Sequence, residues 1–231
     1  VAELLGIALE ALAAAGLTNM SVDLTLPDLV GALAAGPWPV TATLADVQTA
    51  LDGKDAAALQ ALGAARYGAL IEAAGPAEAA LARLKALDAA GALDTRIAGL
   101  ERLVATASPH AAVTIDPTER HGFEYQTWIG FSVFAAGVRG EVGRGGTYLV
   151  RHPGGGEEAA VGFSLYVDGL VDAGLGALRR RRLFVPIGTD AALAAQLRTE
   201  GWTTVAALAD ADTPTRLRCD YALEGGELVK L

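Results

Sequence analysis

The chain has 231 residues, of which 52% are hydrophobic, and its mean hydropathy is +0.35. This length and composition suit one large domain or one domain and part of a second. The apolar residues are mostly Ala and Leu at helical spacing, and no run approaches the roughly 18 consecutive apolar residues of a membrane span. We therefore expect a soluble protein with no membrane contact.

The formal net charge is −9 and the isoelectric point is about 4.8, so the overall field repels polyanions such as nucleic acids. One basic run, Arg179–Arg182, is expected in the last turn of a helix, where cations favour the helix dipole, with phosphate binding as the alternative. The single cysteine, Cys219, excludes an internal disulfide and fits a reducing cytoplasm. The histidines lack metal-ligand spacing, so no metal and no cofactor are expected.

The first two predicted elements are a helix and a strand. Leucine and alanine recur on one helical face over residues 1–16, and Gly16 is typical of a residue just past a helix end. Residues 20–26 alternate apolar and polar side chains, which predicts a half-buried strand. The start lacks signal-peptide features and an initiator methionine, so we expect it to lie partway through a larger protein.

Residues 27–107 are predicted to form an all-helical insertion. Thr43 and Asp46 resemble a capping box, and leucine and isoleucine stripes follow on alanine-rich helices. Such stripes indicate core or helix-pairing surfaces. The expected breaks are Gly36-Pro37, Gly53, Gly75-Pro76 and Gly91.

Strand-like segments rich in β-branched and aromatic residues follow, and they predict an antiparallel sheet. They are Ala112–Ile115, Phe123–Ala136 and Gly146–Val150. Residues 153–158 predict a loop, and residues 161–163 are expected to lead into an apolar helix that ends near Leu175. The fold class is therefore α+β, an antiparallel sheet with helices packed on it.

The tail predicts a small α/β segment. A short strand begins at Arg182, Thr189 is expected to cap a helix that ends at Glu200, and residues 203–208 form a second strand in a β-α-β unit. Gly225-Gly226 predicts a final hairpin. The expected domains are 1–181 and 182–231.

Two polar segments are candidates for function. Gly143–Gly146 (GRGG) lacks the lysine and hydroxyl of a P-loop, so it predicts a hairpin or bulge, although glycines also allow close approach of a small molecule. Glu124, Tyr125, Gln126 and Thr127 are consecutive polar residues in an apolar strand. They either bond one another and the sheet or line a pocket for a small ligand with an amine and a carboxylate.

Together these segments resemble the core of histidyl-tRNA synthetase, a class II aminoacyl-tRNA synthetase. Residues 121–127 (HGFEYQT) are similar to R-G-L-D-Y-Y-T, residues 145–149 (GGTYL) to G-G-R-Y-D, and residues 162–170 (GFSLYVDGL) to G-F-A-x-G-x-E-R-L. The shared pattern extends to about Arg182. The tail resembles a shortened anticodon-binding domain, so tRNA binding is not expected.

The resemblance fails at two arginines. The family's catalytic arginines correspond to His121 and Gly169 here, and fixed positive charges at those positions stabilise developing phosphoryl charge. Arg120 is one residue away from His121, and strand alternation would turn its side chain to the opposite face. The chain therefore looks like a catalytically inactive paralogue.

Such a paralogue resembles the family of ATP phosphoribosyltransferase regulatory subunits. The resemblance implies a non-enzymatic partner of the short-form catalytic subunit at the first step of histidine biosynthesis, responsive to L-histidine, and a homodimer within a hetero-oligomer. It implies a partial histidine site formed by Glu124, Tyr125, Gln126, Thr127, Gly145, Gly146, Tyr148 and Gly162. Two alternatives stay open: an active histidyl-tRNA synthetase and a ligand-free structural dimerisation module.

Overall fold

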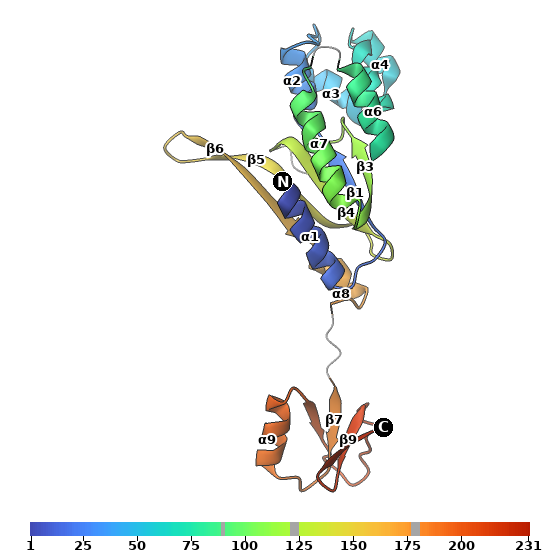
Figure 1. The fold of residues 1–231 in the computed structure, drawn as a ribbon, viewed down its shortest axis with the longest axis vertical. Coiled ribbons are helices and arrows are strands. Elements are labelled where there is room, and N and C mark those ends of the chain that lie inside the picture. Colours follow the sequence, from blue (N-terminus) through green and yellow to red (C-terminus); the bar gives the residue numbers. More distant parts are fainter. Residues whose placement is uncertain (89–90, 121–124, 177–180) are drawn as a thin grey trace. The chain divides into compact units, whose positions relative to one another are not determined.

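A six-stranded sheet organises the first of two units into which the chain divides, Val1–Gly176 and Ala177–Leu231 (Figure 1). The computed structural model describes residues 1–88, 91–120, 125–176 and 181–231. The strand order is β2-β3-β1-β4-β5-β6, with β1 and β3 parallel and the other neighbours antiparallel. The strands are β1 (Met20–Thr25), β2 (Gly75–Pro76), β3 (Ala111–Asp116), β4 (Gln126–Ala135), β5 (Glu141–Arg151) and β6 (Glu157–Leu165).

The central strand β1 gives the sheet one apolar and one polar face. Its side chains alternate between buried and half-buried, as the sequence predicted, with Val22 and Leu24 fully buried. The register pairs Val22 with Val133 and Asp23 with Ser132, and directly paired residues share a face. Helices α1 (Ala2–Ala14) and α7 (Asp94–Ala107) contact each other and the sheet on its apolar side (Figure 1).

The predicted end of the first helix is confirmed. Gly16 has a φ of +100°, and its amide donates to the Ala13 carbonyl while the Leu17 amide donates to the Leu12 carbonyl. This is a Schellman ending, which requires the left-handed backbone that glycine adopts freely. The turn leads the chain directly from α1 into β1.

The predicted helical block contains several short helices, but it is joined to the sheet. Thr43 caps α3 as expected, since its hydroxyl accepts from the Asp46 amide at 3.2 Å. The break at Gly75-Pro76 is the short strand β2, and α6 and α7 contact the sheet, so the expectation of an all-helical insertion was too simple. The helices are α2 (Leu29–Ala35), α3 (Leu44–Asp52), α4 (Ala56–Ala61), the 3₁₀ helix η1 (Ala65–Tyr67), α5 (Gly68–Glu72), α6 (Ala77–Leu87) and α7.

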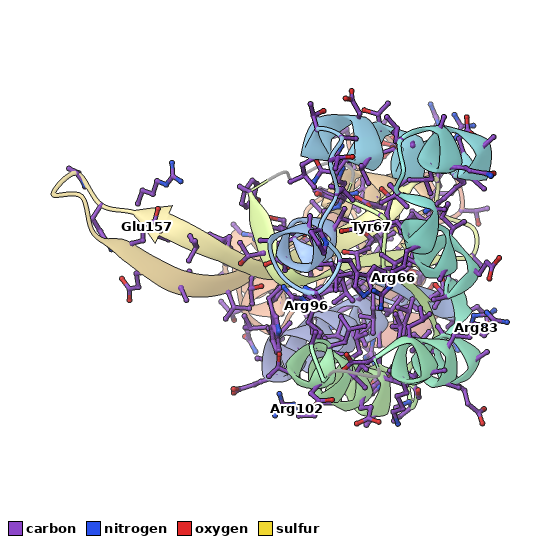
Figure 2. The ribbon with its side chains drawn as sticks, turned by 90° about the horizontal axis from the view of Figure 1, so that it is seen from above. Arg66, Tyr67, Arg83, Arg96, Arg102 and Glu157 are labelled. Carbon is purple, nitrogen blue, oxygen red and sulfur yellow. The ribbon has the colours of Figure 1, made fainter. Side chains whose placement is uncertain are left out.

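The long hairpin of β5 and β6 extends away from the body of this unit (Figures 1 and 2). Strand β6 continues to Leu165, and the predicted helix is only α8 (Val167–Asp172). The expected strand from Phe123 begins at Gln126 in the structure, and residues 121–124 lie outside the described part of the chain. The apolar run after Gly162 belongs to a strand because it pairs with β5 along its whole length.

The second unit contains the predicted β-α-β arrangement. Its elements are β7 (Arg182–Val185), α9 (Ala191–Thr199), β8 (Thr203–Ala206), β9 (Tyr221–Glu224) and β10 (Glu227–Lys230). Strands β7 and β8 are parallel, and Gly225-Gly226 connects the antiparallel β9 and β10 as predicted, with positive φ at both glycines.

Two details of this unit differ from the sequence predictions. Asp190, not Thr189, caps α9, because its carboxylate accepts from the Ala192 amide while the Thr189 hydroxyl donates to the Pro186 carbonyl. The basic run was expected in the last turn of a helix, but Arg182 begins β7, as the predicted strand start at that residue implied, and its guanidinium donates to two backbone carbonyls. Arg179 and Arg180 lie outside the described residues.

Over the residues that the structure describes, no helix combines the length and the apolar character needed to cross a membrane.

A buried hydrogen bond fixes the packing of the helical block. The Tyr67 hydroxyl donates to the Trp38 carbonyl at 2.6 Å, and the two rings meet edge to face at 5.4 Å (Figure 2 labels Tyr67). Burial raises the pKa of Tyr67 despite the opposing charge of Arg66. The phenol is therefore a neutral donor at all physiological pH values.

We expect Tyr67→Phe to lower the free energy of unfolding by about 1 kcal/mol, because the Trp38 carbonyl loses its buried partner while the ring contacts persist. Urea titration of the variant beside the parent chain measures this. An unchanged midpoint would contradict a stabilising role for the bond.

Candidate ligand-binding site

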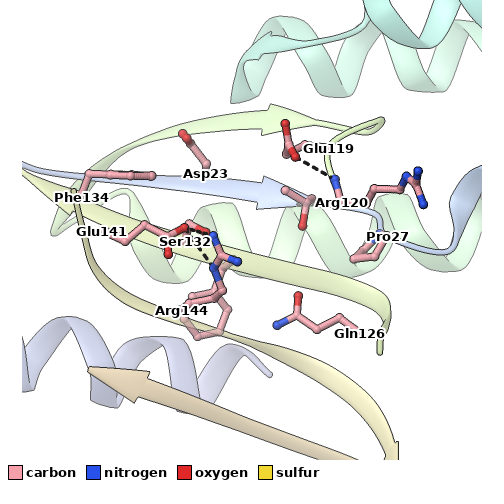
Figure 3. A pocket seen from close by; sticks show the side chains of 11 residues that line it. Asp23, Pro27, Glu119, Arg120, Gln126, Ser132, Phe134, Glu141 and Arg144 are labelled. Carbon is pink, nitrogen blue, oxygen red and sulfur yellow. Dashed lines mark hydrogen bonds and ion pairs between the residues drawn. The ribbon is translucent and has the colours of Figure 1, made fainter. Parts of the chain in front are cut away.

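The polar face of the sheet carries three neighbouring recesses. The strand recess, about 360 Å³, is lined by Asp23, Thr25, Pro27, Glu119, Arg120, Gln126, Phe131, Ser132, Phe134, Glu141 and Arg144 (Figure 3). The corner recess, lined by Pro27, Asp28, Gly31, Ala32, Gln48, Arg120, Gln126 and Thr127, shares residues with it. The glycine recess, about 390 Å³, is lined by Tyr125, Gln126, Arg144, Gly145, Gly146, Tyr148, Gly162, Phe163 and Ser164.

Most of the residues predicted to form a ligand site lie together in the glycine recess. They are Tyr125, Gln126, Gly145, Gly146, Tyr148 and Gly162. Thr127 instead borders the corner recess, and Glu124 lies outside the described residues. Strand register explains the grouping, because Gln126 pairs with Tyr148 and Gly146 pairs with Gly162.

The sequence predicted that the polar run 124–127 lies within one strand, but the structure differs from this prediction at Tyr125. Tyr125 lies in a turn with 56% of its surface exposed, and β4 begins at Gln126. A bulge follows, since the register shifts between Thr127 and Gly130 and Trp128 has a φ of +55°. The bulge allows the Thr147 hydroxyl to donate to the Thr127 carbonyl.

Polar atoms of the glycine recess are held in place by the protein itself. The Gln126 side-chain amide donates to the Gly145 carbonyl at 3.3 Å, and the Tyr125 and Tyr148 rings meet edge to face at 5.8 Å. Gln126 therefore bonds the sheet and lines the recess at the same time. The expected bond to the sheet is confirmed for Gln126, and ligand binding by the polar run stays a prediction.

Arg144, in the middle of β5, borders both the strand recess and the glycine recess. Its Nε donates to Glu141 Oε1 at 3.0 Å, and Nη2 contacts the same carboxylate (Figure 3). The sequence prediction did not include this residue among the site candidates. The sequence signal that could have identified Arg144 is its position between glycines, because such small neighbours leave space over the sheet for a long side chain.

Arg120 follows the turn at residues 117–118 and does not lie in a strand, so the premise of the strand-alternation argument does not hold for it. Its Nε and Nη2 donate to the two carboxylate oxygens of Asp52 at 3.2 and 2.7 Å. It borders the strand and corner recesses while bonded to the end of α3. His121 lies outside the described residues.

Gly169 occupies a packed position in α8. A Cβ there would lie 2.9 Å from Val138 Cγ1, closer than real Cβ contacts. An arginine at this position would require the Val138 side chain to move.

The glycines of the GRGG segment are required by strand packing. They lie inside β5, so the predicted hairpin was wrong. The predicted bulge lies on the opposing strand β4, beside Gly146, whose φ is +157°. A Cβ at Gly145 would lie 2.4 Å from Phe131 Cζ and 2.6 Å from the Gly162 carbonyl oxygen.

A short charged cluster holds the chain just before this site. Asp116 accepts from Lys54 Nζ at 2.7 Å and from the Thr118 amide at 2.9 Å. Burial raises the pKa of the Asp116 carboxyl, but the hydrogen bonds from Lys54 and Thr118 and the charge of Lys54 bring that pKa below its usual value. The carboxylate is therefore ionised in the folded protein.

Across the described ranges, no group of three or more histidine, cysteine, aspartate or glutamate side chains is placed to hold a metal ion.

The histidyl-tRNA synthetase family model matches residues 1–170. The chain belongs to the histidyl-tRNA synthetase family. It is 40% identical over 240 residues to the ATP phosphoribosyltransferase regulatory subunit of Rhodospirillum centenum, covering 100% of this chain and 61% of that protein. It is 43% identical over 220 residues to the regulatory subunit of Paramagnetospirillum magneticum, covering 92% of this chain and 57% of the relative. The chain thus spans about three fifths of the length of these curated relatives, and the resemblance to them is confirmed.

Solved structures agree on the fold. An ATP phosphoribosyltransferase regulatory subunit/histidyl-tRNA synthetase from Bacillus halodurans matches with a TM-score of 0.68 and 20% identity, over 94% of this chain and 61% of that one. The ATP phosphoribosyl transferase (HisG:HisZ) complex from Thermotoga maritima matches with a TM-score of 0.53 and 19% identity, over 70% of this chain and 61% of that one. The predicted α+β class II synthetase-like fold is confirmed.

We expect Gly145→Ala to lower the free energy of unfolding by about 1 to 3 kcal/mol, because the added methyl overlaps the Gly162 carbonyl and the Phe131 ring. Urea unfolding measures the loss. Gly154→Ala is the matched control, since a Cβ there meets nothing within 4 Å. Equal stabilities for the two variants would show that packing does not explain the glycine.

We expect Asp116→Asn to cost about 1 to 2 kcal/mol of unfolding free energy near neutral pH. A carboxyl with a depressed folded-state pKa stabilises the fold fully above its ordinary pKa, and this stabilisation disappears as the pH falls through the lower folded value. The gap between parent and variant should therefore narrow in acid. Unfolding followed from pH 7 to pH 3 tests this, with Glu78→Gln, on the exposed face of α6, as the control. A gap that stays constant with pH would contradict an ionised Asp116 as the source.

Proposed function

We propose that the protein containing this chain is a non-catalytic regulatory subunit of ATP phosphoribosyltransferase, which acts with the short-form catalytic subunit at the first step of histidine biosynthesis. The observation that carries the proposal is identity of 40% and 43% over nearly the whole chain to two proteins of that name. The packed Gly169 supports it, because the chain lacks a cation where the synthetase pattern has a catalytic arginine. The phosphoribosyl transfer occurs on the partner subunit.

The proposed ligand of the glycine recess is L-histidine. An amino acid presents a carboxylate, an ammonium group and, for histidine, ring nitrogens, and the recess offers the Arg144 guanidinium, the Gln126 amide and the Tyr148 hydroxyl. Thr127 and Glu124 belong to the same proposed site as neighbours in sequence. These residues form part of the site, and the remainder of the longer protein supplies the rest.

The second unit is proposed to be a shortened anticodon-binding domain that does not bind tRNA. Its parallel β7 and β8 with the intervening α9 support the domain relationship. The net charge of −9 opposes a large tRNA surface.

The assembly is proposed to contain a homodimer of this subunit within a hetero-oligomer.

The deciding experiment measures phosphoribosyl transfer from phosphoribosyl pyrophosphate to ATP by a short-form catalytic subunit, with and without the full-length protein. We expect stimulation by the protein and inhibition when histidine is added. Histidine-dependent pyrophosphate exchange is measured in parallel. Exchange activity without stimulation would indicate a working synthetase, and the absence of both activities together with absent histidine binding would indicate a structural module.

We expect Gln126→Ala combined with Tyr148→Phe to weaken histidine binding about tenfold or more, because two hydrogen-bonding groups of the recess are lost. Isothermal titration calorimetry on the full-length protein measures the affinity. Gln196→Ala combined with Tyr221→Phe makes the same chemical changes in the second unit and should leave the histidine affinity unaltered. Unchanged affinity in the recess variant would place histidine elsewhere.

A further inference from the structure

Lys54 adopts an unusual backbone conformation at the end of α3. Its φ is +52°, its amide donates to the Leu51 carbonyl, and the Asp55 amide donates to the Ala50 carbonyl. This is a Schellman ending in which lysine occupies the left-handed position that normally favours glycine. The adjacent Gly53 adopts an ordinary helical conformation, so the glycine of this turn is not at the position that requires one.

The contacts of the Lys54 side chain explain why a lysine occupies this left-handed position. Lys54 Nζ lies 2.7 Å from Asp116 Oδ2 and also donates to the hydroxyl of Thr118, a residue with only 3% of its surface exposed. Two residues earlier, Asp52 accepts two hydrogen bonds from Arg120. The α3–α4 corner, defined by Asp52 and Lys54, therefore holds the segment 116–120 at both of its ends.

This segment leads into the recesses. The Asp116 carboxylate also accepts from the amides of Thr118 and Glu119, so the segment forms a tight turn around it. Glu119 and Arg120 line the strand recess, which shares Gln126 and Arg144 with the glycine recess (Figure 3). Asp52 and Lys54 do not line the strand recess, but they hold the segment that carries two of its lining residues, Glu119 and Arg120.

We propose that the α3–α4 corner is a positioning element for the ligand site: Lys54 and Asp52 hold segment 116–120 in the conformation that binds ligand, so that occupancy of the recesses is coupled to the helical block. The identity of the ligand in the test below, histidine, rests on the proposed function. The positioning itself rests on the contacts of this chain.

Lys54→Gly separates positioning from stability. Glycine relieves the left-handed backbone, which offsets part of the cost of removing the ammonium group from Asp116, so the urea midpoint should fall less than in Asp116→Asn. Histidine affinity of the full-length variant should nevertheless fall at least fivefold, and Lys54→Arg, which keeps a cation, should recover most of it. A purely structural role predicts that affinity and stability change together.

Lys85→Gln is the matched control, because it removes another surface ion pair, Lys85 to Glu101 at 2.6 Å, between α6 and α7. It should leave histidine affinity unaltered. If Lys54→Gly binds histidine like the parent, or if Lys85→Gln weakens binding equally, the positioning proposal is overturned.

Hydrogen–deuterium exchange without ligand distinguishes failure of this proposal from failure of the proposed function. The amides of Asp116, Thr118, Glu119 and Arg120 should exchange faster in Lys54→Gly than in the parent, whatever the ligand is. If the parent does not bind histidine, the ligand assignment fails while faster exchange still supports positioning. Equal exchange in the two proteins would overturn the positioning role.

Discussion

The two-sidedness of β1 and its neighbours is the constraint on which the rest of this unit depends. Successive side chains of a strand point to opposite faces, so each buried Val22 or Leu24 places Asp23 or Thr25 on the other side. Helices α1 and α7 cover the apolar face, and the polar face carries the recesses. A one-residue slip of β1 would exchange the core and the site, so the hydrophobic core also fixes the register of the ligand-facing residues.

The floor of the glycine recess consists largely of backbone, because its glycines leave no side chains there. A side chain at Gly145 would overlap Phe131 and the Gly162 carbonyl of β6, and one at Gly146 would overlap the bulged backbone of β4. Arg144 borders the strand and glycine recesses, and its guanidinium is paired with the Glu141 carboxylate of the same strand. An anionic group bound there would contact an arginine that already has a carboxylate partner.

Local patterns predicted the parts of this chain that depend on neighbours in sequence. Alternation identified β1, Gly16 marked the end of α1, and Gly225-Gly226 marked the last hairpin. Six of the eight residues predicted to bind ligand border one recess because of strand pairing, and their binding role stays a prediction. Arg144 and the Lys54–Asp116 pair were missed, since the second joins residues 62 positions apart and no periodicity encodes such a contact. The helix expected after Gly162 failed for a related reason, because short apolar runs suit strand and helix equally.

The candidate ligand residues and the position that aligns with a synthetase arginine lie in different elements of the first unit. Most of the candidate ligand residues belong to β4, β5 and β6, whose backbone pairing forms the sheet itself. The position corresponding to a synthetase arginine lies in α8, outside that pairing, and there Val138 occupies the space that a side chain at Gly169 would need. An arginine at Gly169 would therefore require the Val138 side chain to move. That constraint comes from one side-chain contact, whereas the recess depends on the same strand register that maintains the core.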